Sequence, residues 1–328
     1  MYQNLVLTLK AKVMAKTVKA LTQIKEAQQK WANELKIKKG IDLVSGTFNE
    51  DGIDSNKDKN YFEKIEYNIF GGELNNKDAY SAGDGNEIKA ITHRPKMSAL
   101  HSSSALVVNL FQYWQGKDTS PLLKALVKNN DKTINTTIKF EDKFEIDENK
   151  KKFPKPANLD VTIELLEKNK IIAIESKFTE PYGSVDVKIS KSYLEESLWN
   201  KYPKLKKLKQ LTENIYNKKC NFQYLDAAQL IKHILSLKNS KYKENFTLLY
   251  LWYDVPNTKE AKEHQEEIEA FASIAKADGI DFHHITYQKV IENLNKEEYK
   301  NIENFKEYIN YLEERYKKKS KITHDYEK

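Results

Sequence analysis

Two acidic residues and a lysine are spaced so that together they could hydrolyse a phosphodiester bond. The polar stretch 167–170 separates two apolar, β-branched segments, which predicts a β-hairpin. Asp160 lies in the first segment, and Glu175 and Lys177 lie in the second. Two carboxylates that converge across a hairpin repel each other unless a cation lies between them, and their hard oxygen atoms suit Mg²⁺ or Mn²⁺.

The expected register places these side chains on one face of the hairpin. A two-residue turn at 168–169 would make Asp160 face Lys177 and Thr162 face Glu175. Because side chains two residues apart share a face, the opposite face is expected to be dry while this one carries the chemistry. The dry face would consist of Val161, Ile163, Leu165, Ile172 and Ile174.

This arrangement suits a single metal ion and a water molecule. Asp160, Glu175 and the backbone carbonyl of Ser176 would hold the metal, which would lower the pKa of a bound water and offset charge on the phosphate oxygens. Lys177 would position that water or help to deprotonate it. The alternative is an ordinary surface ion pair between Asp160 and Lys177.

The Glu-x-Lys pattern alone is weak evidence in this chain, because 31% of its residues are charged. None of its other occurrences is predicted to lie in an apolar strand beside a strand with a facing Asp. These occurrences begin at Glu34, Glu87, Glu141, Glu148 and Glu260.

Asp160, fourteen intervening residues and then Glu175-Ser176-Lys177 resemble the signature of the PD-(D/E)XK nucleases, which share the restriction-endonuclease-like fold. The resemblance implies that Asp160 and Glu175 bind the metal and that Lys177 serves the attacking water. One departure is the family's proline, which often directly precedes the first acid and is here Pro156, four residues away.

Flanking segments resemble a bacterial restriction-endonuclease-like branch of the same superfamily. They are Gly-Asp-Gly-Asn-Glu at 83–87, the segment 101–111 and the segment 226–233. By this resemblance Glu87 is a candidate third carboxylate, although it could equally be a solvent-facing residue at a helix N-terminus. His101 could contact a phosphate or could be a buried structural histidine.

Further candidates for DNA binding lie after the hairpin. Gln229 and Lys232 could reach a substrate phosphate from a helix expected at 222–238. The basic run 200–219 could neutralise backbone phosphates, or it could be a solvated lysine face. The candidates in this run are Lys204, Lys206 and Lys207.

The order of the expected elements predicts an α/β, restriction-endonuclease-like fold: a mixed central β-sheet flanked by helices, with an N-terminal helical segment. A helix at 11–36 could pack on its own core or form a dimer seam, so a homodimer stays open. We expect an N-terminal helical segment and loop at 1–80, a nuclease core at 81–297, and a C-terminal helix with a basic tail at 298–328. The other expected elements are a helix at 98–111, strands at 133–145, 246–255 and 282–287, and a helix at 258–277.

Composition sets outer bounds. With 328 residues, 11% of them aromatic, the chain can form a folded core. Its net charge of +7 fits a polyanionic partner or simply an AT-rich genome. The only cysteine, Cys220, excludes an internal disulfide and a cysteine-built zinc site, so a cytoplasmic location is expected. No apolar run approaches the length of a membrane span.

The sequence therefore predicts a magnesium-dependent endonuclease acting on double-stranded DNA, with Mn²⁺ as a substitute metal. The resemblance implies a type II restriction endonuclease that leaves 5′-phosphate and 3′-hydroxyl ends. The alternatives are a DNA-repair, mobile-element or RNA nuclease of the same fold, or a non-catalytic nucleic-acid-binding protein.

Overall fold

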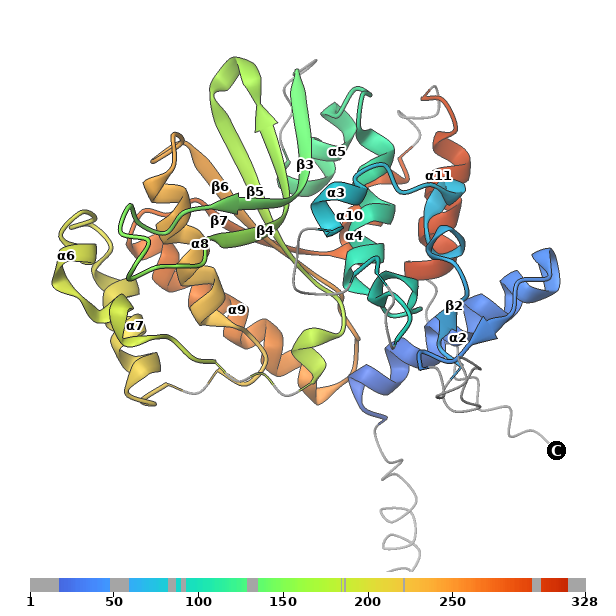
Figure 1. The fold of residues 1–328 in the computed structure, drawn as a ribbon, viewed down its shortest axis with the longest axis horizontal. Helices are drawn as coiled ribbons and strands as arrows, with labels where there is room; N and C mark the ends of the chain where they lie inside the picture. Colours follow the sequence, from blue (N-terminus) through green and yellow to red (C-terminus); the bar gives the residue numbers. More distant parts are fainter. Residues whose placement is uncertain are drawn as a thin grey trace, which may run out of the picture.

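A mixed five-stranded β-sheet organises the chain in the computed structural model (Figure 1). Its strand order is β3-β4-β5-β6-β7, antiparallel from β3 to β5 and parallel from β5 to β7. The strands are β3 (Thr136–Phe144), β4 (Ala157–Leu165), β5 (Lys170–Lys177), β6 (Phe246–Trp252) and β7 (Phe282–Thr286). The structure describes residues 18–47, 59–81, 87–89, 93–128, 135–183, 185, 187–220, 222–296 and 302–317.

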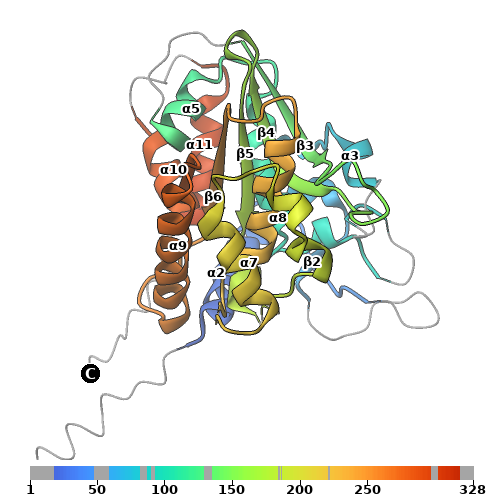
Figure 2. The same ribbon diagram turned by 90° about the vertical axis from the view of Figure 1, so that its left-hand side faces the viewer.

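Helices cover both faces of this sheet, as the edge-on view shows (Figure 2). One face packs against α7 (Lys206–Tyr216), α8 (Ala227–Asn239) and α9 (Lys259–Ala277). The other packs against α4 (Ser103–Phe111), α5 (Ser120–Val127), α10 (Tyr287–Leu294) and α11 (Phe305–Leu312). The smaller elements are α2 (Ala20–Lys39), β1 (Leu43–Val44), β2 (Tyr61–Phe62), α3 (Lys77–Ser81) and α6 (Glu196–Trp199). The predicted fold class, with its flanked mixed sheet and N-terminal helix, is confirmed.

The expectation of one dry and one open face for the hairpin is wrong, because both faces are buried. Ile172 and Ile174 of β5 pack into the core beneath α4, while Ile171 and Ala173 pack into the core beneath α8. A central strand flanked by helices on both sides buries successive residues, so its sequence is almost continuously apolar. The candidate chemistry is therefore confined to one end of the hairpin.

The predicted hairpin register is also wrong, by two residues. Leu165 pairs with Lys170, because the connection is a 3₁₀ turn at 166–168 followed by Asn169 with φ of 44°. A shift of two residues leaves every side chain on its predicted face. It does, however, place Asp160 opposite Glu175 rather than opposite Lys177.

Both ends of the described chain meet at a buried arginine. Arg315, which follows α11, is 3% exposed and donates to Gln28 Oε1 on α2 (3.0 Å), Asn68 O (2.9 Å) and Leu100 O (3.2 Å). Its guanidinium lies over the ring of Trp31, 4.2 Å from the centroid. Arg315 thus ties the N-terminal helix to the C-terminal one. The predicted helix residues up to 17 and the basic tail from 318 lie outside the described residues.

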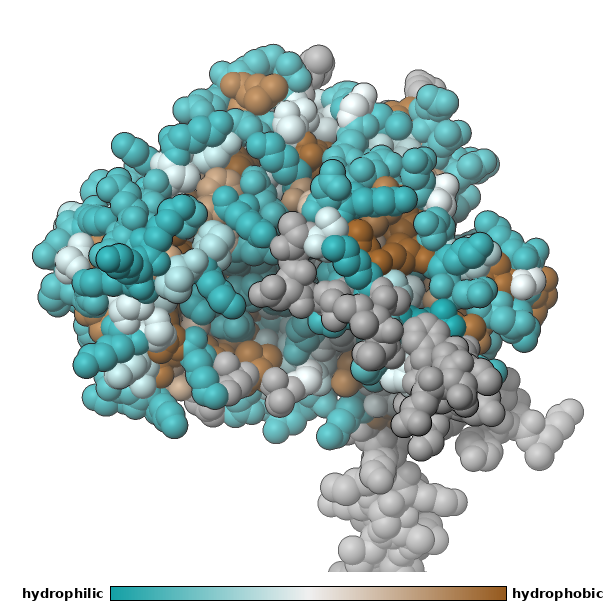
Figure 3. Space-filling view, viewed as in Figure 1, coloured by the Kyte–Doolittle hydropathy of each residue, from teal (hydrophilic) through white to brown (hydrophobic). Residues whose placement is uncertain are grey.

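One face of the molecule is largely polar (Figure 3). The face seen in Figure 3 is mainly hydrophilic, with apolar residues showing in small patches. Among the described helices, none combines the length and the apolar composition needed to cross a bilayer.

Replacing Arg315 with methionine should lower the free energy of unfolding by about 2–4 kcal/mol, because the Leu100 carbonyl and the buried Gln28 Oε1 would lose the donor that Arg315 supplies. Urea denaturation measures this change. As a control, Lys317→Met removes a partly exposed pair with Glu313 and should change the free energy by less than about 1 kcal/mol. Equal effects of the two substitutions would refute the tethering role of Arg315.

Candidate active site

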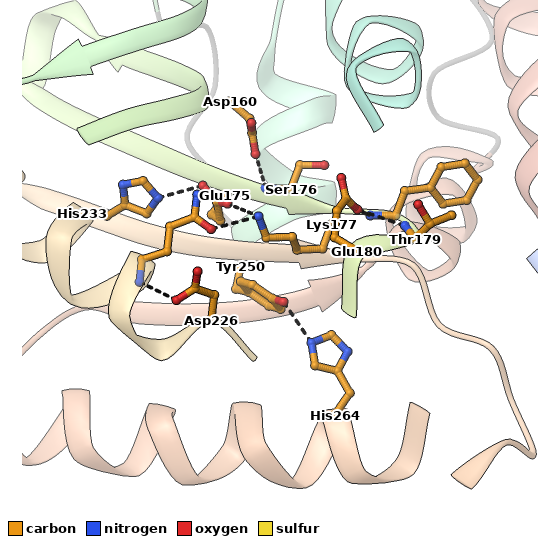
Figure 4. Close-up of polar contacts among 12 residues, drawn as sticks. Asp160, Glu175, Ser176, Lys177, Thr179, Glu180, Asp226, His233, Tyr250 and His264 are labelled. Carbon is orange, nitrogen blue, oxygen red and sulfur yellow. Dashed lines mark hydrogen bonds and ion pairs between the residues drawn. The ribbon is translucent and has the colours of Figure 1, made fainter. Parts of the chain in front are cut away.

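The candidate site begins where β4 and β5 separate. Beyond the last paired positions of the two strands, Asp160 Oδ2 accepts a hydrogen bond from the amide of Ser176 at 2.7 Å (Figure 4). The carbonyl of Lys177 accepts from Tyr253, next to β6. Because successive residues of a strand direct their backbone groups to opposite neighbours, the carbonyl of Ser176 faces the side of Asp160.

Glu175 is the most enclosed member of the site, with 1% of its side chain exposed. Its Oε1 accepts from Lys177 Nζ, and its Oε2 lies 2.8 Å from His233 Nε2. Lys177 also donates to Gln229 Oε1 at 3.0 Å. Figure 4 shows Lys177 and His233 approaching Glu175 from two sides, so this carboxylate is held in one orientation.

Helix α8 carries the residues that contact Glu175 and Lys177 from the side. Asp226 caps its start by accepting from the amide of Gln229 at 2.9 Å. Residues four apart on a helix lie on the same face, so Gln229 and His233 both reach the end of β5. Gln229 is among the residues predicted from the sequence, whereas His233 is not. The sequence feature that could have identified His233 is its spacing of four residues from Gln229.

Burial and charge perturb the pKa values in opposite directions. Burial and the neighbouring Glu175 raise the pKa of Asp160 well above its usual range. Burial alone would raise the pKa of Glu175 too, but Lys177 and His233 outweigh it and lower that pKa to about 2. Although burial opposes its charge, Lys177 has a raised pKa because of Glu175 and Asp160. Asp160 is therefore the carboxylate whose charge is least compensated.

The donor set fits a hard divalent cation. Asp160, Glu175 and the Ser176 carbonyl offer oxygen atoms only, and a cation between the carboxylates would relieve the repulsion that raises the pKa of Asp160. Within the described ranges, no three His, Cys, Asp or Glu side chains gather into a metal cage. The protein would thus supply part of the coordination sphere and water the rest, as is common for Mg²⁺.

One known family matches nearly the whole chain. Residues 25–317 match the family described as restriction endonuclease associating with ARP. The chain belongs to this family. The match includes most of α2 and all of α11 as well as the sheet. No curated protein and no solved structure matches the chain. Membership supports a nuclease role and implies DNA as the substrate.

A further carboxylate, which the sequence did not predict as part of the site, lies beside Asp160. Glu141 lies within β3 with φ of 52°, and the β3–β4 register puts it opposite Asp160. Glu141 thus begins a second Glu-x-Lys pattern in a strand that faces an Asp, although β3 is not the apolar kind of strand that carries Glu175. Asn158 donates to its carboxylate, whereas burial, together with Glu87 and Glu175, raises its pKa. Glu141 could not be predicted from residue propensities, because a left-handed backbone inside a strand is rare.

Glu87, the candidate third carboxylate, is half-buried and accepts a hydrogen bond from Ser104 Oγ at 2.9 Å. Burial raises its pKa. The alternative of a solvent-facing helix N-terminus is wrong, because Glu87 lies in a bend. The preceding 83–86 lie outside the described residues. His101 is half-buried in the turn before α4, and burial lowers its pKa.

The other candidates divide into near and distant groups. Gln229 contacts Lys177 directly, and Lys232 of the same helix lies over the ring of Tyr193. The three lysines of the basic run are exposed around the start of α7, and no contact recorded for the described residues joins them to the hairpin. They are Lys204, Lys206 and Lys207.

Replacing Asp160 with asparagine should stabilise the metal-free protein at pH 7. The raised pKa of Asp160 means that ionising this carboxyl opposes folding once the pH exceeds its unfolded-state pKa, and a neutral amide removes that penalty. Mg²⁺ should stabilise the parent chain by mass action but stabilise the variant much less. Urea denaturation in chelator and in Mg²⁺ measures both effects.

Asp142→Asn is the matched control, since Asp142 accepts from Thr162 in the same sheet. It should lose a little stability and keep the Mg²⁺ response. If Asp160→Asn instead destabilises the metal-free protein as Asp142→Asn does, the carboxylates do not repel each other.

Proposed function

We propose that this protein is a magnesium-dependent endonuclease that hydrolyses phosphodiester bonds of double-stranded DNA as a type II restriction enzyme. The observation that carries the proposal is the convergence of Asp160 and Glu175 at the open end of the hairpin, with Lys177 beside them. The family description supports the restriction role over repair, mobile-element processing or RNA cleavage. Mn²⁺ would substitute for Mg²⁺, because it prefers similar oxygen ligands.

The residues of the site have distinct tasks in this proposal. Asp160, Glu175 and the Ser176 carbonyl would hold Mg²⁺, which supplies a more acidic water and positive charge beside the phosphate. His233 keeps the Glu175 carboxylate oriented. Because its pKa is raised, Lys177 stays protonated and is suited to orienting the attacking water and opposing the charge that develops on the phosphate.

The bond changes define the products. The water oxygen attacks phosphorus, and the bond from phosphorus to the 3′-oxygen breaks, which leaves 5′-phosphate and 3′-hydroxyl ends. A homodimer, with one site for each strand, is part of the proposal and is tested by sedimentation with and without DNA. The family description also names an association with ARP, and we extend that association to this chain as a proposal only.

Plasmid and genomic DNA incubated with the purified protein should be cut into discrete fragments only when Mg²⁺ or Mn²⁺ is present. Calcium should support binding with little turnover, because its looser coordination positions ligands without activating water well. Mapping the fragment ends by sequencing checks both the reaction and the products. Full cleavage in excess chelator would rule out the hairpin site.

Single substitutions should separate the roles of the three hairpin residues. Asp160→Ala and Glu175→Ala each remove a charged metal ligand, so both should weaken metal binding and reduce cleavage by a factor of about a thousand or more. Lys177→Ala should also abolish turnover, but it should leave metal affinity unchanged or higher because it removes a neighbouring cation. Calorimetric metal titration and cleavage rates measure the two effects. Near-normal cleavage by Glu175→Ala or Lys177→Ala would overturn the nuclease mechanism.

Replacing Lys204, Lys206 and Lys207 together with alanine should weaken DNA binding for all sequences. It should also reduce the slope of log affinity against log salt concentration, by an amount that corresponds to the loss of up to about three phosphate contacts. A matched control removes three exposed lysines of α9: Lys259, Lys262 and Lys276. If both triple variants show the parent salt dependence, the basic run at the start of α7 is simply a solvated face.

A further inference from the structure

A cavity of about 710 Å³ opens beside the candidate site. Its walls come from the loop before β4, the start of β4, the segment 188–193 and the first turns of α8. A volume of this size falls in the range that protein sites use for small organic ligands, about 300–1,000 Å³. Gln229 and His233, which contact Lys177 and Glu175, are part of its lining.

The cavity carries an excess of positive charge. Among the residues that the structure describes, its lining includes four lysines and one carboxylate, that of Asp226, which also caps α8. Lys152 forms an ion pair with Glu195 outside the lining. The lysines are Lys152, Lys155, Lys188 and Lys232. This balance favours an anionic ligand such as a phosphate.

Aromatic rings form part of the same wall. Phe153 and Tyr193 both line the cavity, with their ring centroids 5.0 Å apart in an edge-to-face arrangement. Lys232 Nζ lies 5.9 Å from the centre of the Tyr193 ring. An aromatic ring beside cationic groups is the combination with which proteins hold an unstacked base and its phosphate.

Two buried polar atoms at this wall have no hydrogen-bond partner among the described residues: Asn158 Oδ1 and His233 Nδ1. The other polar atom of each side chain contacts the site, since Asn158 donates to Glu141 and His233 Nε2 bonds to Glu175. His233 is 1% exposed. Buried polar groups normally have partners, so a group bound in the cavity could supply the missing ones if the atoms that now cover these two shift on binding.

We propose that this cavity receives one nucleotide of the DNA strand being cut, with its base beside Tyr193, its polar edge toward Asn158 and His233, and its phosphate among the lysines. The inference rests on the proposed function, because it takes DNA as the substrate. A paired base cannot enter, so the nucleotide must leave the helical stack, which is easiest where it is already unpaired. A base in the cavity would then influence the orientation of Glu175, because the base would contact His233 and His233 bonds to Glu175.

The test measures binding without cleavage. Fluorescence anisotropy in excess chelator compares three 30-base-pair duplexes: one fully paired, one with a single unpaired adenosine, and one with a single unpaired abasic nucleotide. The duplex with the unpaired adenosine should bind at least about tenfold more tightly than the other two, the effect of one base stacked on an aromatic ring.

A matched pair of variants ties the effect to the cavity. Ser190 is exposed and lines the cavity, so Ser190→Trp should fill it and abolish the preference for the unpaired adenosine while keeping affinity for the paired duplex. Ser197→Trp, at an exposed position of α6 outside the lining, should retain the preference. Retained affinity for the paired duplex shows that each variant is folded.

The outcomes separate this inference from the proposed function. The nucleotide cavity is overturned if all three duplexes bind with equal affinity, or if the adenosine and abasic duplexes do. It is also overturned if Ser190→Trp keeps the preference for the unpaired adenosine. Each of these results would count against the cavity even if plasmid DNA is still cut in Mg²⁺. If none of the duplexes binds and plasmid DNA stays intact, both proposals fail.

Discussion

The repulsion between two carboxylates at the end of a buried hairpin is the constraint on which the candidate site depends. Asp160 and Glu175 face each other across the hairpin, where Glu175 is buried and Asp160 is half-buried, so their charges must be compensated. Lys177 and His233 compensate Glu175, and the pKa of Glu175 falls accordingly. Asp160 accepts a hydrogen bond from the amide of Ser176, but burial and Glu175 outweigh this bond and the nearby charge of Lys177, so its pKa rises. An oxygen-lined position with excess negative charge is what a divalent cation requires.

The rest of the fold holds this unfavourable arrangement in place. Helices on both faces bury the sheet, so β5 cannot move its end toward solvent to relieve the repulsion. The separation of β4 from β5 leaves the backbone of Ser176 facing Asp160. Helix α8, capped by Asp226, brings Gln229 and His233 to the same point. Arg315 joins the two ends of the described chain on the opposite side of the sheet, which adds stability away from the strained site.

Much of this could be predicted from the sequence, because alternation and spacing depend on backbone geometry that is nearly constant. The hairpin, the shared face of Asp160 and Glu175, and the helix that carries Gln229 all follow from such periods. The register could not be predicted, since it depends on the turn at Asn169, whose left-handed backbone is one of several options for that polar stretch. Glu141 and His233 were missed because their roles arise from tertiary contacts that local patterns do not encode. The burial of both hairpin faces was missed for the same reason.

The most direct test is to locate the metal. A crystal grown with Mn²⁺ should show an anomalous scattering peak within coordination distance of the carboxylates of Asp160 and Glu175 and the carbonyl of Ser176, and the peak should be absent in Glu175→Ala. The account would be contradicted by a well-ordered Mn²⁺ site elsewhere on the protein. In that result Glu175 would still be bonded to both Lys177 and His233, and there would be no metal density beside Asp160.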